Sequence, residues 1–272
     1  MTDGPPIAEE IEAARLAAIA ANDADVEAEV RRHTRRNFIV AGAAAAAGLG
    51  GWKWLRSRPA EGGVAWPFRR VLEANERIAG AFFDPNRLSH TYDPSQVMRP
   101  ARINGGIGLA ANADAENWRL NIEGAAAAVA EGAASPVALT LDDLRAFPRQ
   151  ELTTELRCIE GWTMIVHWTG VRLADVMARF PPAQPVRYLS METPGRGYYV
   201  GLDIASAMHP QTLLAWAING EPLSWQHGAP LRLAIPIKYG VKNIKRIATI
   251  RYTDIRPADF WGERGYDWYC GL

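Results

Sequence analysis

The segment ELRCIEGWTMIVHW, residues 155–168, contains one of only two cysteines in the 272-residue chain. Cys158 directly follows the basic Arg157 and lies two residues before the acidic Glu160. A thiolate is both a nucleophile and a soft metal ligand, and neighbouring cations favour its formation. The segment alone leaves three interpretations open. The cysteine could be a small core residue, a nucleophile paired with His167, or the single protein ligand of a metal held mainly by an organic cofactor.

Composition excludes some classes of protein. Thirty Lys and Arg balance thirty Asp and Glu, so no overall positive field draws the chain to nucleic acid, and we expect no nucleic-acid partner. Two cysteines are too few for a disulfide scaffold. We expect the second one, Cys270, to be a free thiol near the C-terminus.

The first sixty residues differ from the rest of the chain. Residues 1–33 are rich in Ala, Asp and Glu and are expected to form an N-terminal extension with a solvated helix. Residues 34–60 begin TRRNFI and continue with an uncharged stretch at 37–52, which predicts a twin-arginine-type export signal or a weak anchor. No clear A-x-A cleavage site follows. We therefore expect a periplasmic protein, free or tethered to the inner membrane by an uncleaved signal.

Residues 64–272 are expected to form one domain. NWRLNIEG, VRYLSMET, GYYVGL, LRLAIP and IATIRYTDI are typical of short strands bounded by Gly, Pro and Asn. Thr140 is placed to cap a short helix that ends before Pro148. Because strands and short helices are interspersed without regular βαβ alternation, the sequence predicts an α+β fold with mixed sheets.

Three segments carry a resemblance to a known family. They are RCIEGWTMIVHWTGVRLADV from Arg157, LLAWAINGEPLSWQHGAPLRLAIP from Leu213, and IKYGVKNIKRIATI from Ile237. Together they resemble the molybdopterin-binding domain of the sulfite oxidase family, in particular its bacterial exported branch, which includes periplasmic methionine-sulfoxide reductases. The resemblance runs from about residue 66 to residue 261 and implies the sulfite-oxidase-type molybdopterin-binding fold.

The resemblance implies a set of site residues. It makes Cys158 the thiolate ligand of molybdenum in a molybdenum-molybdopterin cofactor and places Arg102 and Arg157 near the reaction centre. The anionic tail of the pterin requires backbone N–H groups and basic side chains. The implied cofactor contacts are Asn104, Ile107, Gly108, Thr193, His227, Arg232, Lys242, Asn243, Ile244 and Lys245.

The implied activity is two-electron oxygen-atom transfer on a small oxo or sulfoxide-type substrate. The chain ends soon after the domain and leaves no room for a fused heme domain, so we expect a separate heme-containing membrane subunit or a soluble cytochrome as electron partner, besides the twin-arginine export machinery. Two alternatives stay open, a non-catalytic scaffold or binding protein that keeps the fold and a sulfite-oxidising dehydrogenase. The latter needs clustered arginines to hold a dianion, and RCIEGW lacks a further basic residue after the cysteine.

Overall fold

The computed structural model of the protein describes residues 7–61, 63–109, 117–127 and 136–272, and gives only the backbone at 7–10, 18–20 and 24. The chain divides into two units, Met1–Arg58 and Pro59–Leu272, and each is described by itself. The first unit contains one helix, α1 (Ile7–Arg56). Within the described residues, α1 alone is long and apolar enough to cross a membrane, judged by length and composition, and signal sequences near an N-terminus meet the same criterion.

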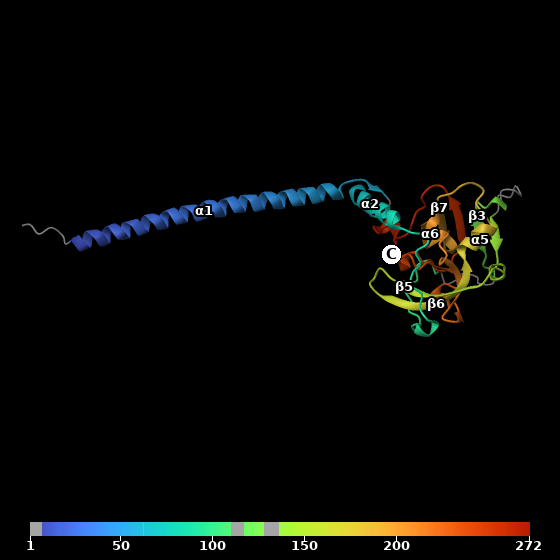
Figure 1. Ribbon diagram of the computed structural model, residues 1–272. Helices are drawn as coiled ribbons and strands as arrows, with labels where there is room; N and C mark the ends of the chain where they lie inside the picture. Colours follow the sequence, from blue (N-terminus) through green and yellow to red (C-terminus); the bar gives the residue numbers. More distant parts are fainter. Residues whose placement is uncertain (1–6, 62, 110–116, 128–135) are drawn as a thin grey trace, which may run out of the picture. The chain divides into compact units, whose positions relative to one another are not determined.

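The second unit is built around two five-stranded sheets (Figure 1). The first sheet has the order β10-β9-β6-β5, with β11 paired to β9, and is entirely antiparallel. Its strands are β5 (Gln150–Arg157), β6 (Thr163–Arg172), β9 (Leu213–Ile218), β10 (Glu221–Pro222) and β11 (Arg232–Ala234).

The second sheet has the order β4-β3-β12-β7-β8 and is mixed, because β12 runs parallel to β3 and antiparallel to β7. Its strands are β3 (Leu120–Glu123), β4 (Val137–Leu139), β7 (Tyr188–Glu192), β8 (Tyr199–Asp203) and β12 (Thr249–Thr253). Among the described residues, this unit also contains short 3-10 helices, a further strand pair and longer helices: β1 (Ala60–Glu61), β2 (Val64–Ala65), α2 (Trp66–Phe82), α4 (Leu141–Arg145), α5 (Leu173–Arg179) and α6 (Ile204–Ala207). The predicted α+β fold with mixed sheets is confirmed.

Local sequence explains several element boundaries. Thr140 caps α4 as predicted, since its hydroxyl accepts from the Asp143 N–H while the Asp143 carboxylate accepts from the Thr140 N–H. The short strands expected between Gly, Pro and Asn residues are present as β3, β7, β8, β11 and β12. Their inward side chains fill the larger core, where Leu120, Leu189 and Ile250 are almost completely buried.

The hairpin of β5 and β6 positions the cysteine. The register pairs Arg157 with Thr163, so residues 158–162 form the connecting turn, here called the cysteine turn. The Cys158 N–H donates to the Trp162 carbonyl at 2.9 Å, and Gly161 has a φ of +87°, a conformation that favours glycine. Cys158 therefore lies at the end of a strand, in a rigid turn.

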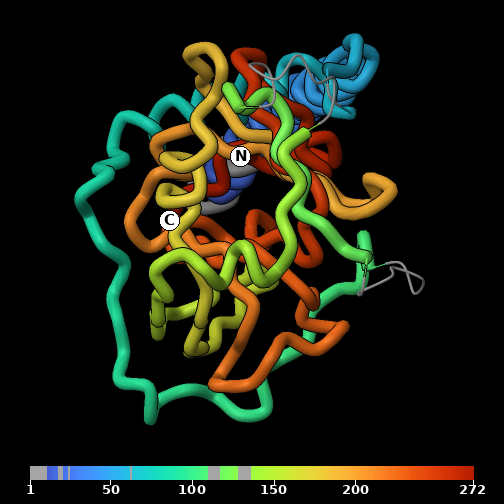
Figure 2. Tube along the Cα trace, turned by 90° about the vertical axis from the view of Figure 1, so that its right-hand side faces the viewer, coloured from blue at the N-terminus to red at the C-terminus, as the bar shows by residue number. Residues whose placement is uncertain are grey.

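A long irregular segment, residues 83–109 and here called the strap, follows α2 and runs around the outside of this unit (Figure 2). The Gln211 side chain holds its first part by accepting from the Ser89 N–H at 2.8 Å and donating to the Ser89 carbonyl at 2.9 Å. The Tyr92 N–H donates to the Thr153 carbonyl on β5 at 3.0 Å. The Tyr92 contact places the strap beside β5, the strand that precedes the cysteine turn.

Candidate active site

A pocket of about 150 Å³ opens over the cysteine turn. Five parts of the chain form its walls: the strap, the cysteine turn, Tyr198 just before β8, the segment 238–245 that we call the lysine loop, and the C-terminal segment 257–272. The lining residues are Asn104, Gly105, Ile107, Cys158, Ile159, Glu160, Tyr198, Gly240, Val241, Asn243, Lys245, Trp261 and Tyr266. We call this cavity the Cys158 pocket.

The thiol of Cys158 forms part of the pocket wall and is 8% exposed. Burial raises its pKa, and the nearby Glu160 carboxylate adds to this effect, whereas the Glu160 N–H and the charge of Arg102 oppose it. Without a metal, the group is thus a protonated thiol at neutral pH. A coordinated metal cation would reverse this preference, because a coordinating thiol is deprotonated.

His167 does not lie beside Cys158. It pairs with Thr153 across the hairpin, five residues along β5 from the cysteine, and thus roughly 16 Å away at about 3.3 Å per residue. Its Nδ1 lies 2.8 Å from the Thr153 hydroxyl oxygen. The Cys/His nucleophile is therefore excluded by the register of the sheet.

The lysine loop packs closely on the backbone of the cysteine turn. A Cβ added at Gly240 would lie 3.3 Å from the Arg157 carbonyl oxygen and 3.7 Å from the Cys158 Cα. The Asn243 side chain shapes the loop by accepting from the Ile235 N–H at 2.9 Å and donating to the Tyr239 carbonyl at 3.3 Å. Asn243 therefore lines the pocket with its side-chain hydrogen bonds already made within the protein.

Lys245 joins the lysine loop to the strap. Its ammonium donates to the carbonyl oxygens of Asn104, of Gly105 at 3.0 Å and of Gln226 at 2.8 Å. Burial, followed by the charge of Arg232, lowers its pKa to about 8. The ammonium of the predicted anion contact thus holds the strap through two carbonyls and the segment around Gln226 through a third.

Arg232 is a buried guanidinium that is hydrogen-bonded to backbone carbonyls but has no counter-charge among the described residues. Arg232 is 3% exposed and donates to the carbonyls of His227 at 3.0 Å and Asn243 at 3.2 Å, with its guanidinium 4.7 Å from the Trp168 ring centroid. Among the described residues no carboxylate lies within 4.0 Å of it, and burial lowers its pKa to about 10.

The imidazole of His227 has one partnered and one unpartnered nitrogen. Nδ1 lies 2.8 Å from the Ser224 hydroxyl oxygen, while Nε2 is buried and makes no hydrogen bond within the described residues. Burial and the charge of Arg232 lower the pKa of His227. A buried cation without a counter-charge next to an unpartnered imidazole nitrogen fits a polar, anionic group.

Gly108, near the end of the strap, packs closely against Thr193 and Tyr198. Gly108 has a φ of +78°, and a Cβ there would lie 2.6 Å from the Tyr198 Cβ and 2.9 Å from the Thr193 Cγ2. The Thr193 hydroxyl accepts from the Tyr198 N–H at 2.9 Å and donates to the Tyr198 carbonyl at 3.1 Å. Both residues fix the turn beneath Ile107, which lines the pocket and is 45% exposed.

Two members of the predicted phosphate loop point away from the pocket. Ile244 is a core residue, 1% exposed. Lys242 is equally buried, and its ammonium donates to the Asp259 carboxylate at 2.5 Å and to the Gly201 carbonyl at 2.9 Å. Of the predicted Lys242–Lys245 loop, only Asn243 and Lys245 line the pocket.

The arginines do not gather into one anion clamp. Arg102 lies with its guanidinium 4.5 Å from the Trp162 ring centroid. Arg157 donates to Glu155 at 2.7 Å and lines a separate hollow of about 430 Å³. Arg196 stacks on Tyr199 at 5.1 Å.

Sequence reasoning did not identify eight residues of the pocket wall: Ile159, Glu160, Gly105, Tyr198, Gly240, Val241, Trp261 and Tyr266. The first two adjoin the cysteine and could have been included from their position. The aromatic residues come from parts of the chain that show no motif, and only the fold places them here. Trp261 and Tyr266 pack edge to face with centroids 5.1 Å apart.

Comparison with known proteins gives a consistent result. Residues 107–261, more than half of the chain, match the family described as oxidoreductase molybdopterin binding domain. A proposed protein-methionine-sulfoxide reductase subunit, YedZ1 of Azospira oryzae, is 32% identical over 72% of this chain and 73% of its own length. The protein-methionine-sulfoxide reductase catalytic subunit MsrP of Xanthomonas axonopodis is 43% identical over 46% of this chain and 44% of its own length.

The MsrP catalytic subunit of Ralstonia nicotianae is 31% identical over 84% of this chain and 71% of its own length. Among solved structures, the sulfane dehydrogenase SoxCD of Paracoccus pantotrophus is 22% identical, with a TM-score of 0.47 over 54% of this chain and 41% of that one. The chain belongs to the oxidoreductase molybdopterin binding domain family, and it is a molybdopterin-dependent oxidoreductase similar to the MsrP catalytic subunits of the sulfite oxidase family.

Proposed function

We propose that this protein is an exported molybdenum enzyme that removes an oxygen atom from a small oxo or sulfoxide-type substrate, with electrons supplied by a separate heme protein. The observation that carries the proposal is the position of Cys158, a single thiol in the wall of a pocket that also contains Asn104 and Lys245. One protein thiolate suits a metal whose other ligands belong to an organic cofactor. When bound, the molybdenum-molybdopterin group would supply a two-electron redox centre that can accept an oxygen atom.

The residues of this chain fit such a cofactor. Cys158 would bind the metal, and the uncompensated charge of Arg232 and the unpartnered Nε2 of His227 would favour a polar, anionic pterin, although neither residue is among those that line the Cys158 pocket. Lys245 fixes the strap carbonyls and adds positive charge to the same region. The protein thus contributes one soft ligand, a buried guanidinium without a counter-charge, and a buried imidazole nitrogen without a hydrogen-bond partner among the described residues.

The pocket wall favours a neutral substrate with an apolar chain. Ile107, Val241 and Trp261 line it, and Glu160 adds a carboxylate beside the thiol. A sulfite dianion would require converging cations, yet Arg102 and Arg157 lie against other partners. A thioether sulfoxide, like the substrate named for the relatives, matches this lining better than sulfite.

Our proposals for export and for electron exchange rest on the N-terminal sequence and on how the relatives are described. The paired Arg35 and Arg36 precede an uncharged helical stretch at 37–52, as in a twin-arginine signal, so we place the protein in the periplasm, free or tethered by α1. The relatives are described as subunits, which supports a separate electron partner, a heme-containing membrane protein or cytochrome.

Purification from a molybdenum-replete host tests the proposal. We expect molybdenum and pterin at about one each per chain, and reduction of methionine sulfoxide with a reduced viologen dye as electron donor. Cys158→Ser is the matched control, expected to fold and to lose turnover because an alcohol remains protonated near neutral pH. Stoichiometric cofactor with full turnover in this variant would remove Cys158 from the metal site. A wild-type protein that contains no molybdenum would contradict the proposed chemistry.

A further inference from the structure

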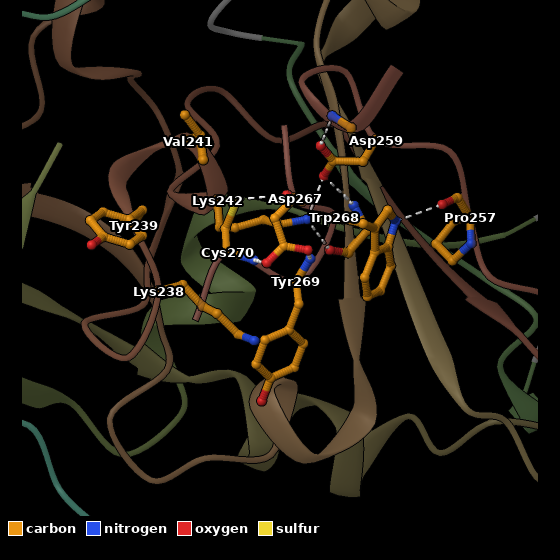
Figure 3. Close-up of polar contacts among 12 residues, drawn as sticks. Lys238, Tyr239, Val241, Lys242, Pro257, Asp259, Asp267, Trp268, Tyr269 and Cys270 are labelled. Carbon is orange, nitrogen blue, oxygen red and sulfur yellow. Dashed lines mark hydrogen bonds and ion pairs between the residues drawn. The ribbon is translucent and has the colours of Figure 1, made fainter. Parts of the chain in front are cut away.

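A buried ion pair connects two segments that both contribute to the wall of the Cys158 pocket. Lys242 belongs to the lysine loop, and Asp259 begins the part of the C-terminal segment that carries Trp261 and Tyr266. Their side chains are 1% and 3% exposed, and Nζ lies 2.5 Å from Oδ2 (Figure 3). Lys242 also donates to the Gly201 carbonyl at 2.9 Å and lies 4.6 Å from the Trp268 ring centroid.

Asp259 organises the aromatic wall. Its Oδ1 accepts from the Gly262 N–H at 2.9 Å, and its backbone carbonyl accepts from the Glu263 N–H at 2.9 Å. The Tyr266 N–H then donates to the Trp261 carbonyl at 3.1 Å, which closes the turn and brings the two rings together. The orientation of this wall therefore depends on the Asp259 carboxylate.

The two residues before Lys242 lie close to Cys158 or line the same pocket. The residue before it, Val241, lines the pocket, and its carbonyl accepts from the Tyr198 hydroxyl at 2.5 Å. Two residues before Lys242, Gly240 packs against the backbone of Arg157 and Cys158. A movement of the Lys242 backbone would thus alter the surface next to the thiol.

We propose that Lys242 is a positioning residue rather than a ligand of the cofactor anion. Its ion pair with Asp259 holds the Trp261–Tyr266 wall at a fixed distance from the cysteine turn. This distance determines how tightly the pocket binds an apolar sulfoxide side chain. The ammonium has no direction free for an outside anion, because the carboxylate, the Gly201 carbonyl and the Trp268 ring surround it. The part of the proposal that concerns substrate binding rests on the proposed function.

Three variants of the full chain test it. Lys242→Met removes the pair, Lys242→Gln with Asp259→Asn replaces it by a neutral hydrogen-bonded pair, and Lys238→Met is the matched control. Lys238 is also 1% exposed and lies in the same loop, but it faces Asp203 at 3.6 Å and the Tyr269 ring, not the aromatic wall. The double variant is expected to fold even if Lys242→Met does not, because it leaves no unpaired buried charge.

The first measurement is amide hydrogen exchange of the holoprotein, which does not depend on turnover. In Lys242→Met, residues 239–244 and 260–266 are expected to exchange at least about tenfold faster together, with pterin content per chain unchanged. The double variant should restore much of the protection, and Lys238→Met should leave 260–266 as in wild type. Pterin loss in both Lys242 variants, or faster exchange confined to 239–244, would overturn the proposal.

The second measurement is steady-state kinetics with methionine sulfoxide and a reduced viologen dye. Lys242→Met is expected to raise KM several-fold with kcat within about twofold, and the double variant to recover most of the loss. If residues 239–244 and 260–266 exchange faster in Lys242→Met but KM is unchanged, the role in substrate binding is refuted. If wild-type protein reduces no sulfoxide, the proposed function fails, while the exchange data still decide whether the ion pair couples the walls.

Discussion

Lys238 offers a quantitative test of the buried charges behind the active site. Its ammonium is almost completely buried and lies 3.6 Å from Asp203 and 2.8 Å from the Tyr269 ring centroid, without a hydrogen-bond partner among the described residues. Burial lowers its pKa from 10.5 to about 7, and the Asp203 charge offsets only part of this effect. The folded protein thus prefers the neutral amine from about pH 7 upward.

The direction of the pH dependence follows from the two pKa values. Between pH 7 and about 10.5 the unfolded chain holds a proton on Lys238 that the folded chain has lost, so the free energy of unfolding rises with pH in this window. Below pH 7 both states are protonated, and the full cost of the buried charge remains. With about 1.36 kcal/mol per pKa unit, the increase from pH 7 to pH 9 is roughly 2 kcal/mol.

The assay is urea unfolding of wild type and Lys238→Met at pH 7 and pH 9. The variant is expected to be more stable at pH 7, and its advantage to shrink by roughly 2 kcal/mol at pH 9 as the wild-type lysine loses its proton. Comparing the two proteins at each pH removes the contributions of all groups that they share. Lys238→Arg is the control. A guanidinium cannot deprotonate, so the free energy of unfolding of this variant should lie as far below that of Lys238→Met at pH 9 as at pH 7.

One result would refute this reasoning. If the stability difference between wild type and Lys238→Met were the same at both pH values, Lys238 would titrate as an ordinary lysine. Its ammonium would then have to reach water, which is inconsistent with its 1% exposure.

Four further predictions concern the site and the C-terminus. Cys158→Ser should fold and be exported but contain no catalytically competent molybdenum, as measured by metal analysis and turnover. Lys245→Glu should lower pterin occupancy, since it adds negative charge beside the proposed anion and releases the strap carbonyls; full occupancy would mean that the anion lies elsewhere. Gly108→Ala should cost about 2–5 kcal/mol in urea unfolding, from the positive φ and the contact with Tyr198, and a change below 1 kcal/mol would contradict the crowding. Cys270→Ser should keep pterin content and activity, because its buried thiol donates only to a backbone carbonyl, and a crosslink between the two cysteines in active protein, detected by non-reducing mass spectrometry, would argue against both assignments.

Much of the fold could be predicted because its signals are local. Short strand-like segments bounded by Gly, Pro and Asn predicted β3, β7 and β12, and Thr140 predicted the start of α4. The position of Cys158 in a turn could be anticipated only in part, since the sequence shows a strand-like run and the register of β5 with β6 decides where the turn begins.

The site was predictable where a motif carried it and not elsewhere. Cys158, Asn104 and Lys245 were named from the resemblance, and the fold brings them to one pocket. Trp261 and Tyr266 were missed, because aromatic residues near a chain end are equally typical of core packing. Their role depends on contacts with the lysine loop that no local pattern encodes.

The sequence by itself determined the family, the α+β class and the choice of Cys158 as the central residue, because these depend on residue types and on spacing along the chain. The tertiary structure alone decided which way each buried cation points. Lys242 and Lys245 stand three residues apart, yet one reaches Asp259 and the other the strap carbonyls of Asn104 and Gly105, which are about 140 positions away in sequence. A buried ammonium must find its acceptors wherever the fold supplies them, and those acceptors exist only once distant segments have packed together.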